Sequence, residues 1–333
     1  MFALFLLALV VIGGTVLVVV ALRSGSRDHI AVPTVDPKYA MDVTAQVRGT
    51  RRRMTLALCL YLAVGFIVTL DPLGLQPTNW LGLGQALGVA IAAILVGLLL
   101  AASPVAAWSR AGGVRTADLT PRTGGSFGPR WGFALPLASA GILVAVLVVM
   151  GFTSSPDGAG LYRAFTIELP DGSSSGSPYP GWFYGVPLMI ATLALALVVL
   201  LVLRMVASAP RPATAELYSV DDALRRSVTA FIMLLSSSAL LLYFGAVTAV
   251  AGTVTANTAT QWTTSSDELN SVDGVSFADY LPSYLQPTYG LGIAETFCGL
   301  ALVAVSVVLL VLAAVTSTLR WATVVAEVEK VDA

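Results

Sequence analysis

Seven long apolar runs divide this chain, and they constrain its fold more than any other feature of the sequence. None of them contains Lys or Arg, and each is about as long as the 20 helical residues that cross a hydrocarbon core. Within lipid a chain must pair its own backbone groups, and these runs lack the polar alternation of barrel strands. The sequence therefore predicts an all-α membrane protein, a seven-transmembrane helical bundle that forms one domain over residues 1–333. The predicted spans are residues 2–22, 54–70, 80–102, 131–152, 181–203, 227–251 and 289–316.

Composition and charge placement support a membrane location and predict its orientation. Hydrophobic residues make up 56% of the chain and charged residues 11%, a balance outside the range of water-soluble domains. All of the 18 Lys and Arg except Arg163 lie in alternate connecting segments or in the C-terminal segment after the last span. Because Lys and Arg are retained in cytoplasmic loops, we predict a multi-pass plasma (inner) membrane protein with its N-terminus outside and its C-terminus in the cytoplasm.

The two longest predicted outer segments differ in pattern. In the segment 153–180, Tyr162 to Leu169 alternate in polarity and Pro170-Asp171-Gly172 is a turn sequence, so a small hairpin is expected there. The serine-rich stretch 173–177 is expected to be flexible. Trp182, Phe183 and Tyr184 then stand where an aromatic belt anchors a span at the membrane surface. The segment 252–288 is rich in Thr and Ser and holds no Lys or Arg, which predicts a solvated polar loop.

A helix start is predicted before the sixth span. Ser219 and Asp222 have the spacing of a capping box. Asp221 and Asp222 each precede an arginine, Arg225 and Arg226, by four residues, which is the spacing of side-chain pairs on a helix surface. We therefore expect a short helix that runs from the cytoplasmic segment directly into the sixth span.

The sequence predicts no enzymatic chemistry. Two G-x-S-x-G matches, around Ser126 and Ser174, lie in Gly/Ser-rich segments, and the one histidine of the chain is His29, so neither match has the context of a nucleophile elbow. Cys59 and Cys298 lie in separate spans without neighbouring ligand residues, which favours packing thiols over a metal site. We predict no catalytic residue, cofactor, metal site or nucleic-acid partner.

One acid stands well inside a predicted span. Glu295 lies about two turns into the seventh span, and Gln85 lies at a similar depth in the third. A buried charge in lipid is costly, so an intramembrane acid is a candidate functional group. The two side chains form a candidate intramembrane polar site that binds a proton or cation. The alternative is a neutral, hydrogen-bonded Glu295 that locks the bundle or faces a wet vestibule.

The cytoplasmic stretch Arg115-Thr116-Ala117-Asp118-Leu119-Thr120-Pro121-Arg122, followed by Phe127, Pro129, Arg130 and Trp131, resembles a segment of uncharacterised multi-pass membrane proteins of actinobacteria. Members of that family are often encoded beside a GntR-type regulator and an ABC-type ATPase. The resemblance implies a permease-like or accessory role and assigns no catalytic or ligand residue.

Three function classes remain open from the sequence. The first is a non-enzymatic membrane component of an ABC-type transporter, whose cytoplasmic segments 105–130 and 206–226 dock an ATPase or another membrane subunit. The second is a secondary carrier that uses Glu295. The third is an envelope sensor or scaffold that acts through its outer loops. The candidate docking residues of the first class are Arg115, Asp118, Arg122, Asp221, Arg225 and Arg226.

Overall fold

Six long helices and one small sheet make up the part of the chain that the structure describes. The computed structural model describes residues 39–70, 81–102, 124–128, 130–169, 172–212, 214–264 and 281–318. The long helices are α2 (Ala40–Leu70), α3 (Leu83–Ala102), α4 (Arg130–Thr153), α5 (Trp182–Ser208), α6 (Tyr218–Thr264) and α8 (Gln286–Thr318). The shorter elements are the 3-10 turns η3 (Gly124–Phe127) and η4 (Ala215–Leu217) and the strands β1 (Ser155–Pro156), β2 (Tyr162–Leu169) and β3 (Gly172–Gly176).

The predicted helical architecture is confirmed, and the helices fit the predicted membrane class. All six long helices are long and apolar enough to cross a membrane, and each contains, or nearly coincides with, one of the six predicted runs that follow residue 53. The first predicted span, residues 2–22, lies outside the described residues.

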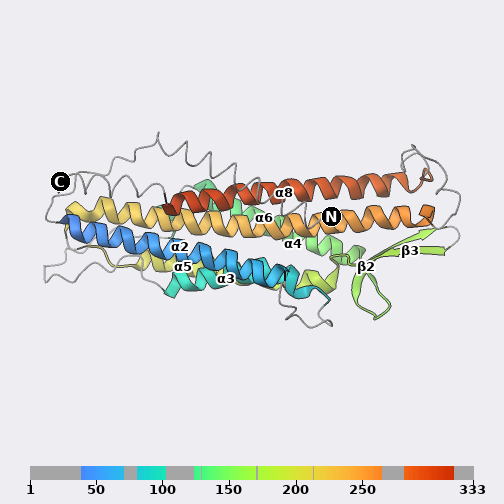
Figure 1. The fold of residues 1–333 in the computed structure, drawn as a ribbon, viewed down its shortest axis with the longest axis horizontal. Helices are drawn as coiled ribbons and strands as arrows, with labels where there is room; N and C mark the ends of the chain where they lie inside the picture. The colour runs from blue at the N-terminus through green and yellow to red at the C-terminus, as the bar shows by residue number, and fades with distance from the viewer. Residues whose placement is uncertain are drawn as a thin grey trace.

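Helix α6 is the central element of the bundle. It packs against α2, α3, α4, α5 and α8, and the helices lie roughly along one long axis (Figure 1). Large exposed apolar side chains occur on each of the other five long helices but on no described part of α6. Phe152 of α4, Ile190 of α5 and Phe297 of α8 are examples, each more than 60% exposed. An apolar outer surface around a packed central helix is the arrangement that lipid stabilises, because lipid tails are as apolar as these side chains.

The most extensive helix contact joins α6 to α8, and glycines allow the two backbones to meet. A Cβ added at Gly245 would lie 2.6 Å from the carbonyl oxygen of Gly299. One added at Gly292 would lie 2.5 Å from the backbone nitrogen of Ala256. Small residues at such positions bring helices close enough for backbone-to-backbone packing, which is a main source of helix association in membranes.

Both ends of α6 extend beyond the predicted span 227–251. Its start at Tyr218 agrees with the helix expected before the sixth span. Its end at Thr264 contradicts the prediction of a polar loop beginning at residue 252. The polar residues that suggested a loop alternate with small residues: Ala256 and Ala259 are buried, while Asn257 is exposed. The extra turns are stabilised by packing against α8 and β3, which the local sequence does not indicate.

The predicted hairpin in the segment 153–180 is confirmed. Strands β1, β2 and β3 form an antiparallel sheet in that order, and β2 pairs with β3 from Phe165 opposite Gly176 to Leu169 opposite Gly172. The expectation that residues 173–177 are flexible is wrong for Ser173 to Gly176, because they form β3. This strand lies on the end of α6, where the Ser174 hydroxyl donates to the carbonyl oxygen of Thr258 at 2.9 Å.

The turn between β1 and β2 is closed by one aspartate. Its carboxylate accepts hydrogen bonds from the backbone N–H groups of Ala159 and Leu161, at 2.8 and 3.0 Å. The Nε–H of Arg163 also donates to Asp157. The Leu161 hydrogen bond, with the Arg163 side chain and the Ala159 amide adding to it, holds the pKa of Asp157 below its usual value. The only cation of the predicted outer segments is therefore used inside the sheet.

Candidate functional site

The two residues of the candidate intramembrane site do not form a joint site in the structure. Gln85 is exposed near the start of α3, a helix that packs mainly on α2, α5 and α6. Glu295 is half-buried on α8, which packs mainly on α6. Among the described residues, no hydrogen bond joins Glu295 to Gln85. The polar pair proposed from matching depths therefore lacks the helix contact that it needed.

Glu295 lies instead beside a buried tyrosine at the end of the bundle that carries the sheet, which we call the sheet end. The Tyr179 hydroxyl shares a hydrogen bond of 2.9 Å with the Thr153 hydroxyl, at the last residue of α4. Its ring packs on Phe165 of β2, with centroids 5.3 Å apart. Burial raises the pKa of Tyr179, the Thr153 hydrogen bond lowers it, and the negative charge of Glu295 raises it further.

The position of Glu295 limits its chemistry. Its charge acts on Tyr179, which binds the last residue of α4, so the carboxyl lies near the level where α4 ends rather than halfway along the bundle. A carboxyl group there can exchange a proton or attract a cation at the edge of the apolar region. Sequence reasoning missed Tyr179, because a tyrosine in a Ser/Pro-rich segment has no local pattern that indicates burial.

Two of the three consecutive serines in the middle of α6 donate to helix backbones, and the third, Ser237, has no hydrogen-bond partner among the described residues. The Ser238 hydroxyl donates to the carbonyl oxygen of Ser306 on α8 at 2.9 Å, and the Ser236 hydroxyl donates to Met233 within α6 at 3.1 Å. Ser236, Ser237 and Ser238 are all buried. The hydrogen bonds of Ser236 and Ser238 are those of packing groups, since serine hydroxyls commonly join helices in membranes.

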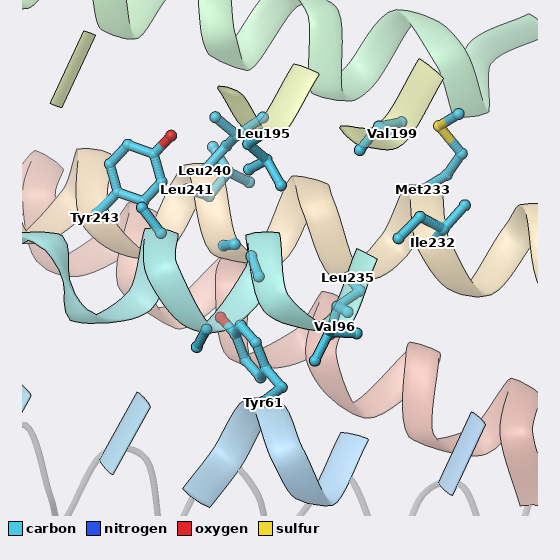
Figure 2. Close-up of a cluster of buried hydrophobic side chains, with 14 of the residues drawn as sticks. Tyr61, Val96, Leu195, Val199, Ile232, Met233, Leu235, Leu240, Leu241 and Tyr243 are labelled. Carbon is cyan, nitrogen blue, oxygen red and sulfur yellow. The ribbon is translucent and has the colours of Figure 1, made fainter. Parts of the chain in front are cut away.

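Two tyrosines add hydroxyl groups to the same interior. Figure 2 shows Tyr61 of α2 and Tyr243 of α6 within the main cluster of buried apolar side chains. The Tyr243 hydroxyl shares a hydrogen bond of 3.0 Å with Thr192 of α5, and the Thr192 hydroxyl lies 2.8 Å from the carbonyl oxygen of Leu188. The Tyr243–Thr192 hydrogen bond joins α6 to α5, whereas the buried Tyr61 hydroxyl has no hydrogen-bond partner among the described residues.

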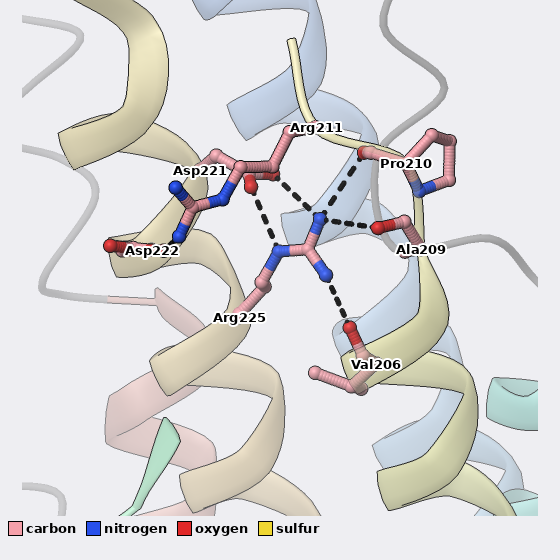
Figure 3. Close-up of polar contacts among 7 residues, drawn as sticks. All are labelled: Val206, Ala209, Pro210, Arg211, Asp221, Asp222 and Arg225. Atoms are coloured by element: carbon pink, nitrogen blue, oxygen red, sulfur yellow. Dashed lines mark hydrogen bonds and ion pairs between the residues drawn. The ribbon is translucent and has the colours of Figure 1, made fainter. Parts of the chain in front are cut away.

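The most polar buried group of the described chain is an ion pair at the end opposite the sheet. The Asp221 and Arg225 side chains are both fully buried, and the Arg225 Nε lies 2.8 Å from a carboxylate oxygen of Asp221. The rest of the guanidinium donates to backbone carbonyls at the end of α5 (Figure 3). These are the carbonyl oxygens of Val206, of Ala209 at 2.9 Å and of Pro210 at 3.2 Å.

This arrangement makes Arg225 a cap for another helix. The last carbonyls of a helix have no partner within it, and a positive charge is favourable at that end of the helix dipole. The guanidinium also lies over the Phe127 ring of η3, 5.5 Å from its centroid. One side chain of α6 therefore joins the end of α5, the start of α6 and η3.

A second Arg–Asp pair lies beside this contact between α5 and α6, which we call the α5–α6 joint. Arg211 lies 3.3 Å from Asp222 and packs over the Tyr218 ring at 4.7 Å. Arg226 is exposed.

The predicted docking role is wrong for Asp221 and Arg225, because their side chains are buried and bind one another and α5. The i,i+4 spacing indicated a solvated helix face, whereas the end of α5 covers it. Of the remaining candidates, Arg226 is exposed, and Arg115, Asp118 and Arg122 lie outside the described residues.

Within the described part of the chain, no group of three or more His, Cys, Asp and Glu side chains is placed to hold a metal ion. Cys59 and Cys298 are free and exposed rather than packed inside the bundle as predicted. Comparison with protein-family models, with curated proteins and with solved structures found no match to this chain.

Proposed function

We propose that this protein is a non-enzymatic, multi-pass component of the plasma (inner) membrane that serves as an accessory subunit of an ABC-type transporter. In this proposal the chain crosses the membrane seven times, with residues 2–22 as the first span. Its N-terminus lies outside and its C-terminus in the cytoplasm, as the placement of Lys and Arg favours. The sheet end then faces outward.

The main support for the proposal is a projection of the structure at the sheet end. Gly252 of α6 packs against Gly292 and Thr296 of α8, near the level of Glu295. Beyond that contact α6 continues for residues 253–264 and α8 begins at Gln286. Together with β2 and β3 these turns extend past the ends of α3, α4 and α5 (Figure 1), and we call this unit the projection.

The α6 face of the projection is polar, whereas its α8 part exposes Leu291. Thr253, Asn257 and Gln261 are its exposed residues on one face of α6, whereas the exposed large side chains of the bundle are apolar. At 47 residues, α6 is about 70 Å long, more than twice the hydrocarbon thickness of about 30 Å. A chain that needed only to cross the membrane would not need these turns, so they favour contact with a partner outside the bilayer.

The choice of partner rests on the resemblance of residues 115–131 to proteins encoded beside ABC-type ATPases. The buried hydroxyls of Ser238, Tyr243 and Thr192 are used in contacts between helices or within a helix, as an accessory role allows, whereas those of Tyr61, Thr229 and Ser237 have no hydrogen-bond partner among the described residues. A carrier that uses Glu295 needs a polar path to the middle of the bundle, and the position of Glu295 near the sheet end does not favour it.

Photo-crosslinking tests this proposal. A crosslinking phenylalanine analogue at position 257 or 261, on the exposed face of the projection, is expected to give a discrete protein adduct in native membranes. The adduct is expected to contain a transporter membrane subunit, and its ATPase is expected to co-purify. The same analogue at Ile190 or Leu193, on the apolar face of α5, serves as the matched control and is expected to give lipid adducts. Equal lipid or solvent adducts at all four positions, with no ATPase in the purified sample, would reject the accessory role.

A further inference from the structure

Five exposed arginines lie on α2, α5 and α6 at the end opposite the sheet. Three stand on one face of α2, at the i, i+3 and i+4 spacing that places side chains together; one stands on α5 and one on α6. All five are exposed, and none pairs with a carboxylate among the described residues. The set, which we call the arginine belt, is Arg48, Arg51, Arg52, Arg204 and Arg226.

Helix contacts place these arginines at one level of the bundle. Val43 and Val47 of α2 share a buried cluster with Val220 and Leu224 of α6, so Arg48 lies close to the level of Arg225. Arg225 in turn binds Val206 near the end of α5, which brings Arg204 and Arg226 to within about a turn of the same level.

The belt borders an apolar surface that has the thickness of a membrane core. Leu56 of α2 and Leu200 of α5 are 54% and 61% exposed, and each lies about one turn from the belt. From Arg204 back to Trp182 at the other end of α5 there are 22 helical steps, or about 33 Å, which matches the hydrocarbon thickness of about 30 Å. Trp182 meets the exposed Phe152 ring edge to face there, as an aromatic anchor at the opposite surface does.

We propose that the arginine belt binds the phosphate groups of anionic phospholipids. A guanidinium matches phosphate with two parallel hydrogen bonds, and the apolar surface beside the belt accommodates the acyl chains of the same lipid. Three arginines outside the belt differ from it, because Arg163, Arg211 and Arg225 each form an ion pair with an aspartate of this chain. The arginines of the belt instead present guanidinium groups that pair with no carboxylate of the described residues. This inference does not depend on the transporter proposal.

Lipid retention by the full-length protein tests the inference. The protein is placed in bilayers of equal phosphatidylglycerol and phosphatidylcholine, extracted gently, and its bound lipids are measured by mass spectrometry. We expect the wild type to keep phosphatidylglycerol in at least a fivefold excess, since each arginine near an anionic surface contributes about that factor. We expect R48Q/R51Q/R52Q to lose most of this excess, and R48K/R51K/R52K to keep much of it.

Two controls separate the sources of the effect. R163Q removes a cation outside the belt and is expected to leave the excess unchanged. In the second control, inorganic phosphate is added, and chloride is added to a parallel sample at the same ionic strength. The two salts are expected to change the excess of bound phosphatidylglycerol equally. Equal retention of the two lipids by the wild type would overturn the inference. So would a loss caused by inorganic phosphate alone, because the belt would then bind free anions. Because the wild type is itself compared between two lipids, the test does not depend on how well the variants fold.

Discussion

A single added methyl group at Gly292 is expected to destabilise the protein by about 2 kcal/mol, within the range of overpacked cores. The Cβ of Gly292→Ala would lie 2.5 Å from the Ala256 backbone nitrogen and 2.6 Å from the Gly252 carbonyl oxygen. Backbone atoms cannot rotate away as a side chain can, so α6 and α8 must move apart. Denaturant unfolding of the purified protein in detergent measures the change.

Gly290 provides the matched control for this variant. It lies two residues earlier in α8, and an added Cβ there meets nothing within 4 Å. Because alanine is the better helix former, Gly290→Ala is expected to stabilise the protein by up to about 1 kcal/mol. Equal effects of the two substitutions would show that α6 and α8 do not meet through their backbones at Gly292.

Removal of the Arg225 side chain is expected to cost about 3–5 kcal/mol, the range for breaking one partner of a buried ion pair. Arg225→Ala leaves the Asp221 carboxylate buried without its cation and leaves the carbonyl oxygens of Val206, Ala209 and Pro210 without their donor. The α5–α6 joint is expected to loosen first. Unfolding measurements give the loss of stability, and hydrogen exchange at the end of α5 locates it.

The neighbouring exposed residue serves as the control. Arg226→Ala is expected to change stability by no more than about 0.5 kcal/mol, as surface substitutions do. The double variant Asp221→Leu/Arg225→Met removes both charges and is expected to recover part of the loss, because apolar residues can replace a buried ion pair. It is not expected to reach the wild type, since the α5 carbonyls still lack a donor. Similar stability of Arg225→Ala and Arg226→Ala would contradict the capping role.

The spans could be predicted from the sequence because lipid imposes both length and composition on them. The predicted run 131–152 differs by one residue at each end from α4 (Arg130–Thr153). The strand pattern of Tyr162 to Leu169 likewise predicts β2 with its correct bounds. In both cases the signal is local, a continuous apolar run or a polar alternation followed by a turn.

The candidate site depended on tertiary contacts that no local pattern indicates. Asp221 and Arg225 have the spacing of a surface pair, and only the arrival of the α5 end buries them. The turns of α6 after residue 251 resemble a polar loop until α8 and β3 cover one side. Glu295 and Gln85 lie at similar depths in their predicted spans. However, α3 and α8 do not form one of the main helix contacts, and depth alone does not indicate which helices are neighbours.

The most direct test of the account is the side of the membrane on which the projection stands. In a protein with Cys59 and Cys298 replaced by serine, single cysteines at Asn257→Cys and Arg226→Cys, both at exposed positions, are treated with a membrane-impermeant maleimide. We expect labelling of Asn257→Cys in intact cells and of Arg226→Cys only after the membrane is opened. Labelling of Arg226→Cys alone in intact cells would invert the topology and contradict the proposal of an outward projection.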